Sequence, residues 1–233
     1  MALFALGDLH LSHAVAVAKP MDIFGPVWEK HEDKIARNWR RIVRPEDLVL
    51  IPGDISWALK LDGALPDLNW LARLPGEKLL VRGNHDYWWT GIGKIRRVLP
   101  PGIYALQNDY FPWREWAICG TRGWICPGQE GFDPVHDEKL YRRELGRLRL
   151  SLEKAVKDGF AQMVVALHYP PTNGRHEPSG FTDLFHNYPV KKCIYGHLHG
   201  EAQTAALVGE WEGIEYSLVA ADAVDFTPVL ILA

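Results

Sequence analysis

Gly83-Asn84-His85-Asp86 and Gly196-His197-Leu198-His199 are the two stretches that decide how the chain is read. Each follows an apolar run of strand length, Lys78–Val81 for the first and Lys192–Tyr195 for the second. Each begins with a glycine, which lets the chain turn sharply where a strand ends. Because open α/β sheets carry their sites at strand ends, both stretches predict ligand-type side chains at a sheet edge. Taken alone, His-x-His fits two unrelated surface histidines equally well.

Three further predicted strands end in the same kind of residue. Asp8 and His10 follow the first strand, Asp54 follows the second, and His168 follows a strand in the second half of the chain. Period-2 spacing places Asp8 and His10 on the same side, so both can bind one ion. A turn aspartate with an incidental histidine is the alternative for that motif by itself. Five such strand ends in one chain are much less probable by chance than any single one.

The side chains at these strand ends form a mixed oxygen and nitrogen set without a thiolate. Such a set suits Mn, Fe or Zn better than a metal that prefers sulfur. It holds more ligands than one ion needs. The sequence therefore predicts two divalent ions that share one carboxylate.

Composition and charge narrow the class of protein. The chain has 233 residues, 47% of them hydrophobic, and a net charge of −3 from 26 basic and 29 acidic residues. This balance argues against a general polyanion-binding surface. Three cysteines, Cys119, Cys126 and Cys193, read as free thiols in a reducing compartment. Without a signal peptide at Met1–Gly7 or a membrane-length apolar run, we expect a soluble, cytoplasmic protein.

Strands alternate with helices along the chain, which predicts parallel strand pairing and right-handed crossovers. The predicted helices are Trp28–Val43, Ala58–Leu74, Trp88–Val98, Asp137–Lys157 and a short one at Phe181–His186. The predicted strands are Ala2–Leu6, Asp47–Ile51, Lys78–Val81, Ile103–Leu106, Trp116–Cys119, Gln162–Leu167, Lys192–Tyr195, Glu215–Ala220 and Val229–Leu232. The last two are expected to close a second sheet, and Leu11–Val27 is expected to be an irregular loop. No linker or repeat is evident, so residues 1–233 are predicted to form a single domain.

The order of the five blocks resembles that of the calcineurin-like metallophosphoesterases: Asp-x-His, Gly-Asp, Gly-Asn-His-Asp, His and Gly-His-x-His. All five occur in this order between Asp8 and His199. The resemblance implies an α/β fold, a four-layer α-β-β-α sandwich with two mixed sheets flanked by helices. It also implies a metal-dependent phosphohydrolase, in which a dinuclear centre and a metal-activated hydroxide hydrolyse a phosphoester.

The resemblance assigns a role to each matching residue. Seven residues would bind the two ions: Asp8, His10 and His199 the first, Asn84, His168 and His197 the second, and Asp54 both as a bridge. His85 would not be a ligand but would stabilise the phosphate or protonate the leaving oxygen. Asp86 would orient His85 by a hydrogen bond.

Substrate selection is expected to come from the loops near the strand ends. Trp88 and Trp89 follow His85 and could stack on a planar group, although packing inside the fold explains them as well. Arg122 could contact a phosphate, and Tyr169 and Asn173 follow His168. The candidate substrate contacts are thus Arg122, Trp88, Tyr169 and Asn173. The expected partner is a small phosphorylated molecule, a phosphodiester or phosphomonoester, with no role for a membrane.

Other functions compete with this one. A nuclease acting on DNA or RNA is the alternative among enzymes, but the mild acidity counts against nucleic-acid binding. A non-catalytic scaffold of the same fold, like the related retromer subunit, tends to lack ligands or the histidine that corresponds to His85, and here all are present. A regulatory metal sensor would not need the His85-Asp86 pair.

Overall fold

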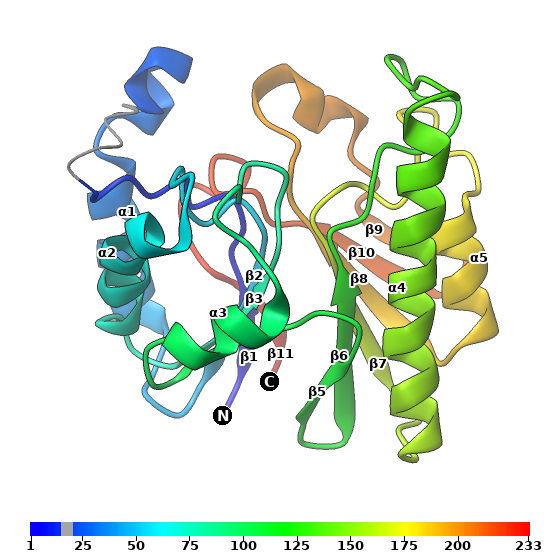
Figure 1. The fold of residues 1–233 in the computed structure, drawn as a ribbon, viewed down its shortest axis with the longest axis horizontal. Helices are drawn as coiled ribbons and strands as arrows, with labels where there is room; N and C mark the ends of the chain where they lie inside the picture. Colours follow the sequence, from blue (N-terminus) through cyan, green and yellow to red (C-terminus); the bar gives the residue numbers. More distant parts are fainter. Residues whose placement is uncertain (15–20) are drawn as a thin grey trace. The chain divides into compact units, whose positions relative to one another are not determined.

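Two sheets of mainly parallel strands organise the protein (Figure 1). The computed structural model describes residues 1–14 and 21–233. Its contacts divide the chain into two compact units, unit 1 with Met1–Ala105 and Val219–Ala233, and unit 2 with Leu106–Leu218. That residues 1–233 form a single domain stays a prediction.

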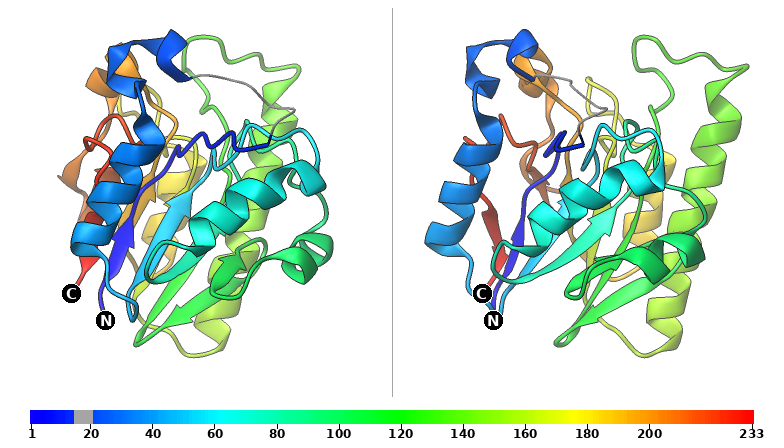
Figure 2. Two further views of the ribbon diagram at one scale, coloured as in Figure 1. Left: turned by 90° about the vertical axis from the view of Figure 1, so that its left-hand side faces the viewer. Right: turned by 60° about the vertical axis from the view of Figure 1, so that its left-hand side comes forward.

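The sheet of unit 1 has the strand order β11-β1-β2-β3-β4. Its strands are β1 (Leu3–Ala5), β2 (Leu48–Pro52), β3 (Glu77–Val81), β4 (Ile103–Ala105) and β11 (Val229–Leu232). Strands β1 to β4 are parallel, and β11 pairs antiparallel with β1, where Leu3 lies opposite Leu232. The two ends of the chain therefore lie side by side, as both views in Figure 2 show.

Three helices share a core with one face of this sheet. They are α1 (His31–Ile42), α2 (Leu61–Ala72) and α3 (Ile92–Val98), preceded by two 3-10 turns, η1 (Met21–Phe24) and η2 (Pro26–Trp28). Alternate residues of β2, Val49 and Ile51, pack in the same cluster as Trp39 of α1 and Leu68 of α2. This period-2 pattern is what fixes which face of the sheet the helices cover.

The sheet of unit 2 has the order β5-β6-β7-β8-β10-β9. Its strands are β5 (Tyr110–Trp113), β6 (Trp116–Thr121), β7 (Met163–Leu167), β8 (Val190–Tyr195), β9 (Gly209–Trp211) and β10 (Ile214–Leu218). The inner strands are parallel and both edge strands are antiparallel. Helices α4 (Asp137–Lys157) and α5 (Gly180–Asn187) pack on it through Leu148, Leu152 and Phe181, and η3 (Gly200–Ala205) follows β8.

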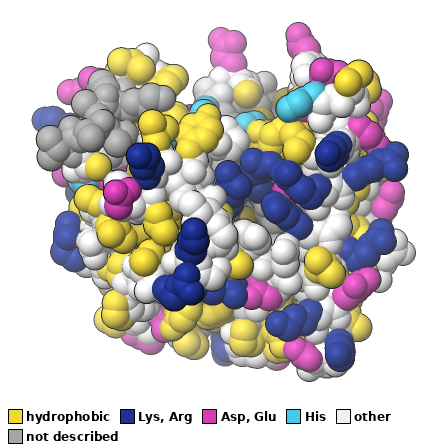
Figure 3. Space-filling model, viewed as in Figure 1, with side chains coloured by type: hydrophobic (Ala, Val, Ile, Leu, Met, Phe, Trp, Pro, Cys, Tyr) yellow, Lys and Arg dark blue, Asp and Glu magenta, His cyan; other side chains and the backbone are white. Residues whose placement is uncertain are grey.

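Helix α4 begins and ends where its apolar spacing predicts. Its outer face carries mixed basic and acidic side chains (Figure 3). Arg142 pairs with Glu138 at 2.5 Å, while Arg143 and Arg147 pair with the fully buried Glu144 at 3.3 and 2.9 Å. These arginines thus have acidic partners within the helix.

Several element predictions were wrong in their bounds or their sheet. Val229–Leu232 closes the first sheet rather than the second, because it pairs with β1. Helix α1 begins at His31 instead of Trp28, because Lys30 has left-handed backbone geometry with φ 50°. Edge strands β5 and β9 were not predicted; β5 contains Pro112, which is tolerated at an edge. Residues 15–20 of the loop predicted for Leu11–Val27 lie outside the described residues, and η1 and η2 lie in its second half.

Two other sequence predictions concern the cysteines and the membrane. Cys119, Cys126 and Cys193 are free, as predicted, and the structure also shows that all three are buried. Within residues 1–14 and 21–233, no helix combines the length and the apolar character that crossing a bilayer requires.

Lys78 of β3 carries a charged group into the core of unit 1, where its Nζ donates to the carbonyl of Leu74. Burial lowers the pKa of Lys78 from 10.5 to about 8. Between these two pH values the unfolded chain binds a proton that the folded protein does not, so stability rises with pH there.

We expect Lys78→Met to raise Tm at pH 7 by about 2–4 °C, because the variant no longer buries an ammonium group. The gain should shrink as the pH rises from 8 to 10. Thermal melts across this range test the prediction, with the exposed Lys191→Met as the control for the change in net charge. An equal gain at pH 7 and pH 10 would contradict it.

Candidate metal centre

The strand ends of unit 1 hold three predicted ligands in left-handed backbone conformations. Asp8, His10 and Asp54 have φ values of 57°, 46° and 52°. Such geometry is uncommon for residues other than glycine and concentrates at functional sites. Here the backbone of one strand end supports the other, since Asp8 N donates to Gly53 O at 3.0 Å and His10 N to Asp54 O at 2.9 Å.

These three side chains converge on one another. His10 Nε2 lies 3.8 Å from Asp54 Oδ2, and ligand atoms of Asp8 lie within 4.8 Å of those of His10 and Asp54. Asp8, His10 and Asp54 are 0%, 3% and 2% exposed. Two buried carboxylates this close repel each other unless a cation offsets their charge. Unit 1 therefore presents a local set that can bind a divalent ion.

Gly83 lets the Gly-Asn-His-Asp turn reach Asp54. A Cβ atom at this position would lie 2.1 Å from Asp54 Oδ1 and 2.2 Å from Asp54 N. His85, two residues after Gly83 in this turn, donates its backbone N–H to the same Oδ1 at 2.9 Å. The position of Asp54 thus depends on the absence of a side chain at residue 83.

Asp86 is completely buried and ties two loops of unit 1 together. Its Oδ1 accepts from Ile55 N at 2.9 Å, Ser56 N at 3.2 Å and Trp88 Nε1 at 2.9 Å, and its Oδ2 accepts from Gly83 N at 2.7 Å. Burial raises the pKa of Asp86, and the four donors oppose that shift. That Asp86 orients the His85 ring by accepting a hydrogen bond from it stays a prediction. The Asp86 carboxylate therefore positions the turn that carries His85 by binding backbone N–H groups.

Trp57 is a residue of this region that the sequence motifs do not mark. Its ring stacks on His10 with centroids 4.8 Å apart and an interplanar angle of 23°, and it lies 4.5 Å from the His85 ring. Trp57 is 6% exposed and donates through Nε1 to the Met21 sulfur. Its place three residues after Asp54 is the only sequence signal that could have suggested it.

The predicted histidines of unit 2 also come together. His168 follows β7 and His197 follows β8, and His197 Nδ1 lies 3.2 Å from His168 Nε2. Two nitrogens that each lie about 2.0–2.1 Å from a tetrahedral Zn²⁺ would be about 3.3 Å apart. His197 again has a left-handed backbone, with φ 73°. This pair has the separation expected of two ligands on one ion.

Tyr169 and Arg122 support the histidine pair. The Tyr169 ring lies 4.1 Å from the His197 ring, and the backbone carbonyl of Arg122 accepts from both His168 N and Tyr169 N at 3.0 Å. The Arg122 guanidinium lies over the Trp124 ring at 4.3 Å and 3.8 Å from Glu144. Tyr169 and the backbone of Arg122, two of the four predicted substrate contacts, therefore lie beside His168. Arg122 also holds the backbone at this strand end.

Two of the predicted substrate contacts, Trp88 and Asn173, are buried and bonded within the protein, and their contact with a substrate stays a prediction. Trp88 is fully buried in the core of unit 1, where it serves as a donor to Asp86, and Trp89 is buried beside it. Asn173 is 4% exposed, and its side chain bonds Pro127 O, Glu177 Oε2 and two backbone N–H groups. Both positions were inferred from proximity in sequence, which does not reveal which way a side chain points.

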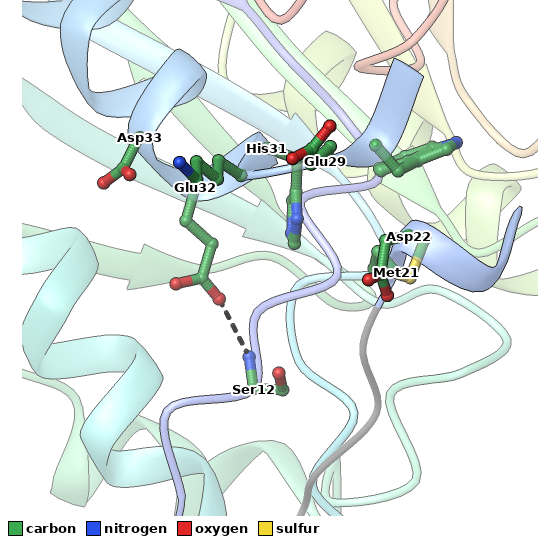
Figure 4. A pocket seen from close by; sticks show the side chains of 9 residues that line it. Ser12, Met21, Asp22, Glu29, His31, Glu32 and Asp33 are labelled. Carbon is green, nitrogen blue, oxygen red and sulfur yellow. Dashed lines mark hydrogen bonds between the residues drawn. The ribbon is translucent and has the colours of Figure 1, made fainter. Parts of the chain in front are cut away.

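A pocket of about 410 Å³ in unit 1 has the wrong charge for a phosphate. Figure 4 shows Glu32 accepting from Ser12 N, at 3.4 Å, on its wall. The pocket is lined by four carboxylates: Asp22, Glu29, Glu32 and Asp33. Lys30 is the one Lys or Arg side chain among the described residues that line this pocket. A phosphate group would be repelled there.

Comparison with known proteins places these residues in a family. The calcineurin-like phosphoesterase profile matches residues 1–201, which include every predicted ligand. The chain belongs to the calcineurin-like phosphoesterase family, and the resemblance inferred from the five blocks is confirmed.

Two curated relatives match parts of the chain. A stretch of 79 residues, 34% of the chain, is 43% identical to the Gene 66 protein of Mycobacterium phage D29 and spans 37% of that protein. A stretch of 151 residues, 65% of the chain, is 29% identical to an uncharacterized protein of Methanocaldococcus jannaschii and spans 81% of it. This chain thus matches little more than a third of the length of the phage relative.

A solved structure shows the same fold. The phosphopantetheinyl hydrolase of Mycobacterium tuberculosis superposes with a TM-score of 0.61, over 99% of this chain and 95% of that one, at 15% sequence identity. The predicted α/β class with two mixed sheets flanked by helices is confirmed.

We expect Gly83→Ala to destabilise the protein by about 1–3 kcal/mol, the usual cost of forcing atoms into a packed site. The new methyl group must displace Asp54, including its backbone, so bound metal should fall as well. Melting curves and metal analysis after purification test this.

Gly93→Ala is the matched control, because a Cβ there meets no atom within 4 Å. It lies inside α3 and should stabilise by about 0.5–1 kcal/mol. Native Tm and native metal content in Gly83→Ala would refute the proposed contact with Asp54.

Proposed function

We propose that the protein is a metal-dependent phosphoester hydrolase with two divalent ions. The observation that carries this proposal is the arrangement of predicted ligands inside each unit. Unit 1 brings Asp8, His10 and Asp54 together. In unit 2, His197 Nδ1 lies 3.2 Å from His168 Nε2. Membership of the family supports the idea that both sets serve one reaction.

The donor types fit the proposed ions. Carboxylate oxygens, imidazole nitrogens and the amide oxygen of Asn84 suit Mn, Fe or Zn. The first ion is assigned to Asp8, His10 and His199, the second to Asn84, His168 and His197, and Asp54 to both. When bound, such ions lower the pKa of water and offset charge on phosphoryl oxygens.

The charges of the chain's own residues favour an anionic substrate once metals are bound. Asp8 and Asp54 contribute −2 to the ligand set, and the imidazoles and Asn84 are neutral ligands. Two divalent ions would therefore leave an excess of positive charge for a phosphate. The Arg122 backbone lies beside the His168 strand end, while its guanidinium lies 3.8 Å from Glu144, which offsets its charge.

His85 is assigned to the leaving group. It is half-buried, its ring lies 5.9 Å from that of His10, and its backbone is held by Asp54. Histidine is the commonest general acid in enzymes, and the His85 ring is assigned to give a proton to the leaving oxygen. Trp57 against one side of the ring restricts its orientation.

The substrate proposed is a small phosphodiester or phosphomonoester. The net charge of −3 gives no general electrostatic attraction for nucleic acid, which makes a nuclease the weaker proposal. A cytoplasmic location remains a proposal from the free cysteines alone.

Metal-stripped protein refilled with Mn, Fe, Zn or Mg should hydrolyse a bis-aryl phosphodiester or an aryl phosphomonoester. Restoration by one transition metal supports the proposal, and the preferred ester tells a phosphodiesterase from a phosphatase. Two bound ions without turnover on either ester would favour a scaffold.

His85→Ala should lower kcat by about 10²–10⁴-fold, the usual contribution of general acid–base catalysis, and keep its metal content. Asp54→Ala is the contrasting variant, because loss of the proposed bridge should reduce occupancy at both ions. Metal analysis beside steady-state kinetics tests both. Metal loss in His85→Ala would make His85 a ligand, and two retained ions in Asp54→Ala would refute the bridge.

A further inference from the structure

A pocket of about 370 Å³ lies in unit 2 next to a predicted metal ligand. His197 and Tyr169 form part of its lining, together with residues of loop 125–130, loop 169–174 and η3. Its volume falls in the range of about 300–1,000 Å³ that small-molecule sites occupy. A group attached to a phosphate held near His197 could therefore extend into it.

Hydrogen bonds fix the walls of this pocket relative to one another. Gly174 N donates to Gln129 Oε1 at 2.7 Å, which joins the two loops. Cys126 Sγ lies 3.5 Å from Pro171 O and joins them again. His176 Nε2 lies 3.1 Å from Ala205 O, which ties η3 to the second loop. A pocket with pinned walls binds without a large ordering cost.

The lining is mainly apolar and carries no cationic side chain. Ile125, Pro170, Leu198 and Ala205 present hydrocarbon, and the lining residues, all within the described ranges, include no Lys or Arg. Glu130 adds a carboxylate. A second phosphate or a carboxylate would meet repulsion here, whereas an uncharged ring would lose water favourably.

We propose that this pocket binds the organic group that stays on phosphorus, and that it selects uncharged aromatic or apolar groups of about one ring system. The inference rests on the proposed function. That function assigns the leaving oxygen to His85 of unit 1, which leaves the pocket beside His197 for the retained group. The predicted class of substrate is a phosphodiester with one compact, neutral, apolar substituent.

A series of diesters with one leaving group tests the proposal. All release 4-nitrophenolate, and the retained group is methyl, phenyl or 4-carboxyphenyl. With full-length protein and the metal that restores activity, phenyl should exceed methyl in kcat/KM by at least ~10-fold. The 4-carboxyphenyl diester should have a lower kcat/KM than the phenyl diester, because the Glu130 carboxylate repels its carboxylate.

Ala205→Trp fills the pocket from η3 and should lower kcat/KM for the phenyl diester to that for the methyl diester, which abolishes the preference for phenyl. Val208→Trp is the matched control, since Val208 is exposed and does not line the pocket. Glu130→Lys should raise kcat/KM for the 4-carboxyphenyl diester relative to that for the phenyl diester. Equal rates for methyl and phenyl in the native protein, or equal losses in both Trp variants, would overturn the proposal.

Binding separates this proposal from the proposed function. If neither a diester nor an aryl phosphomonoester is hydrolysed, the proposed function fails. Calorimetry with phenyl phosphate and methyl phosphate on the metal-loaded protein then tests whether the pocket binds the aromatic group. Tighter binding of phenyl phosphate that Ala205→Trp removes supports the pocket. Equal affinities for the two esters overturn it.

Discussion

The buried carboxylate of Asp86 is the constraint on which the motif-bearing part of unit 1 depends. Its four donors come from the segment after Asp54 and from the Gly83–Trp88 turn. Hydrogen bonds to a charged group contribute about 1.5–3 kcal/mol each, and an unpaired buried carboxylate would cost several kcal/mol. The fold therefore tolerates Asp86 only when both segments occupy their observed places. Those places bring His85 N onto Asp54 Oδ1.

Contacts between loops also explain why the backbone stays strained at the predicted metal ligands of unit 1. Asp8, His10 and Asp54 keep positive φ values because the hydrogen bonds between the two strand ends leave no alternative path for the chain. Strain of this kind costs of order 1–3 kcal/mol per residue and survives only where the surroundings over-determine it. It accompanies the convergence of the Asp8, His10 and Asp54 side chains beyond the ends of their strands. Ligand geometry in unit 1 is thus a property of the backbone.

The sequence predicted what depends on pattern and missed what depends on tertiary contact. Apolar runs followed by Asp, His or Asn were enough to find the strands. After four of these five runs, the predicted metal ligand lies close to a predicted ligand from another strand end. Trp57 and the four donors of Asp86 were not predictable, because both arise where loops from separate strands meet. Trp88 shows the converse: it lies two residues after the motif, yet its indole is buried in the core of unit 1.

The cysteines bear on which metal would suit the proposed centre. Cys126 lines the pocket that also contains His197, so a thiol lies within the same unit as the histidine pair. Burial raises the pKa of Cys126 to about 12, and its sulfur lies 3.5 Å from the carbonyl oxygen of Pro171. This contact holds the thiol against the backbone, and Cys126 is assigned no place in the proposed ligand set. The proposed donors are oxygen and imidazole nitrogen, which would suit Mn, Fe or Zn better than thiophilic Cu(I).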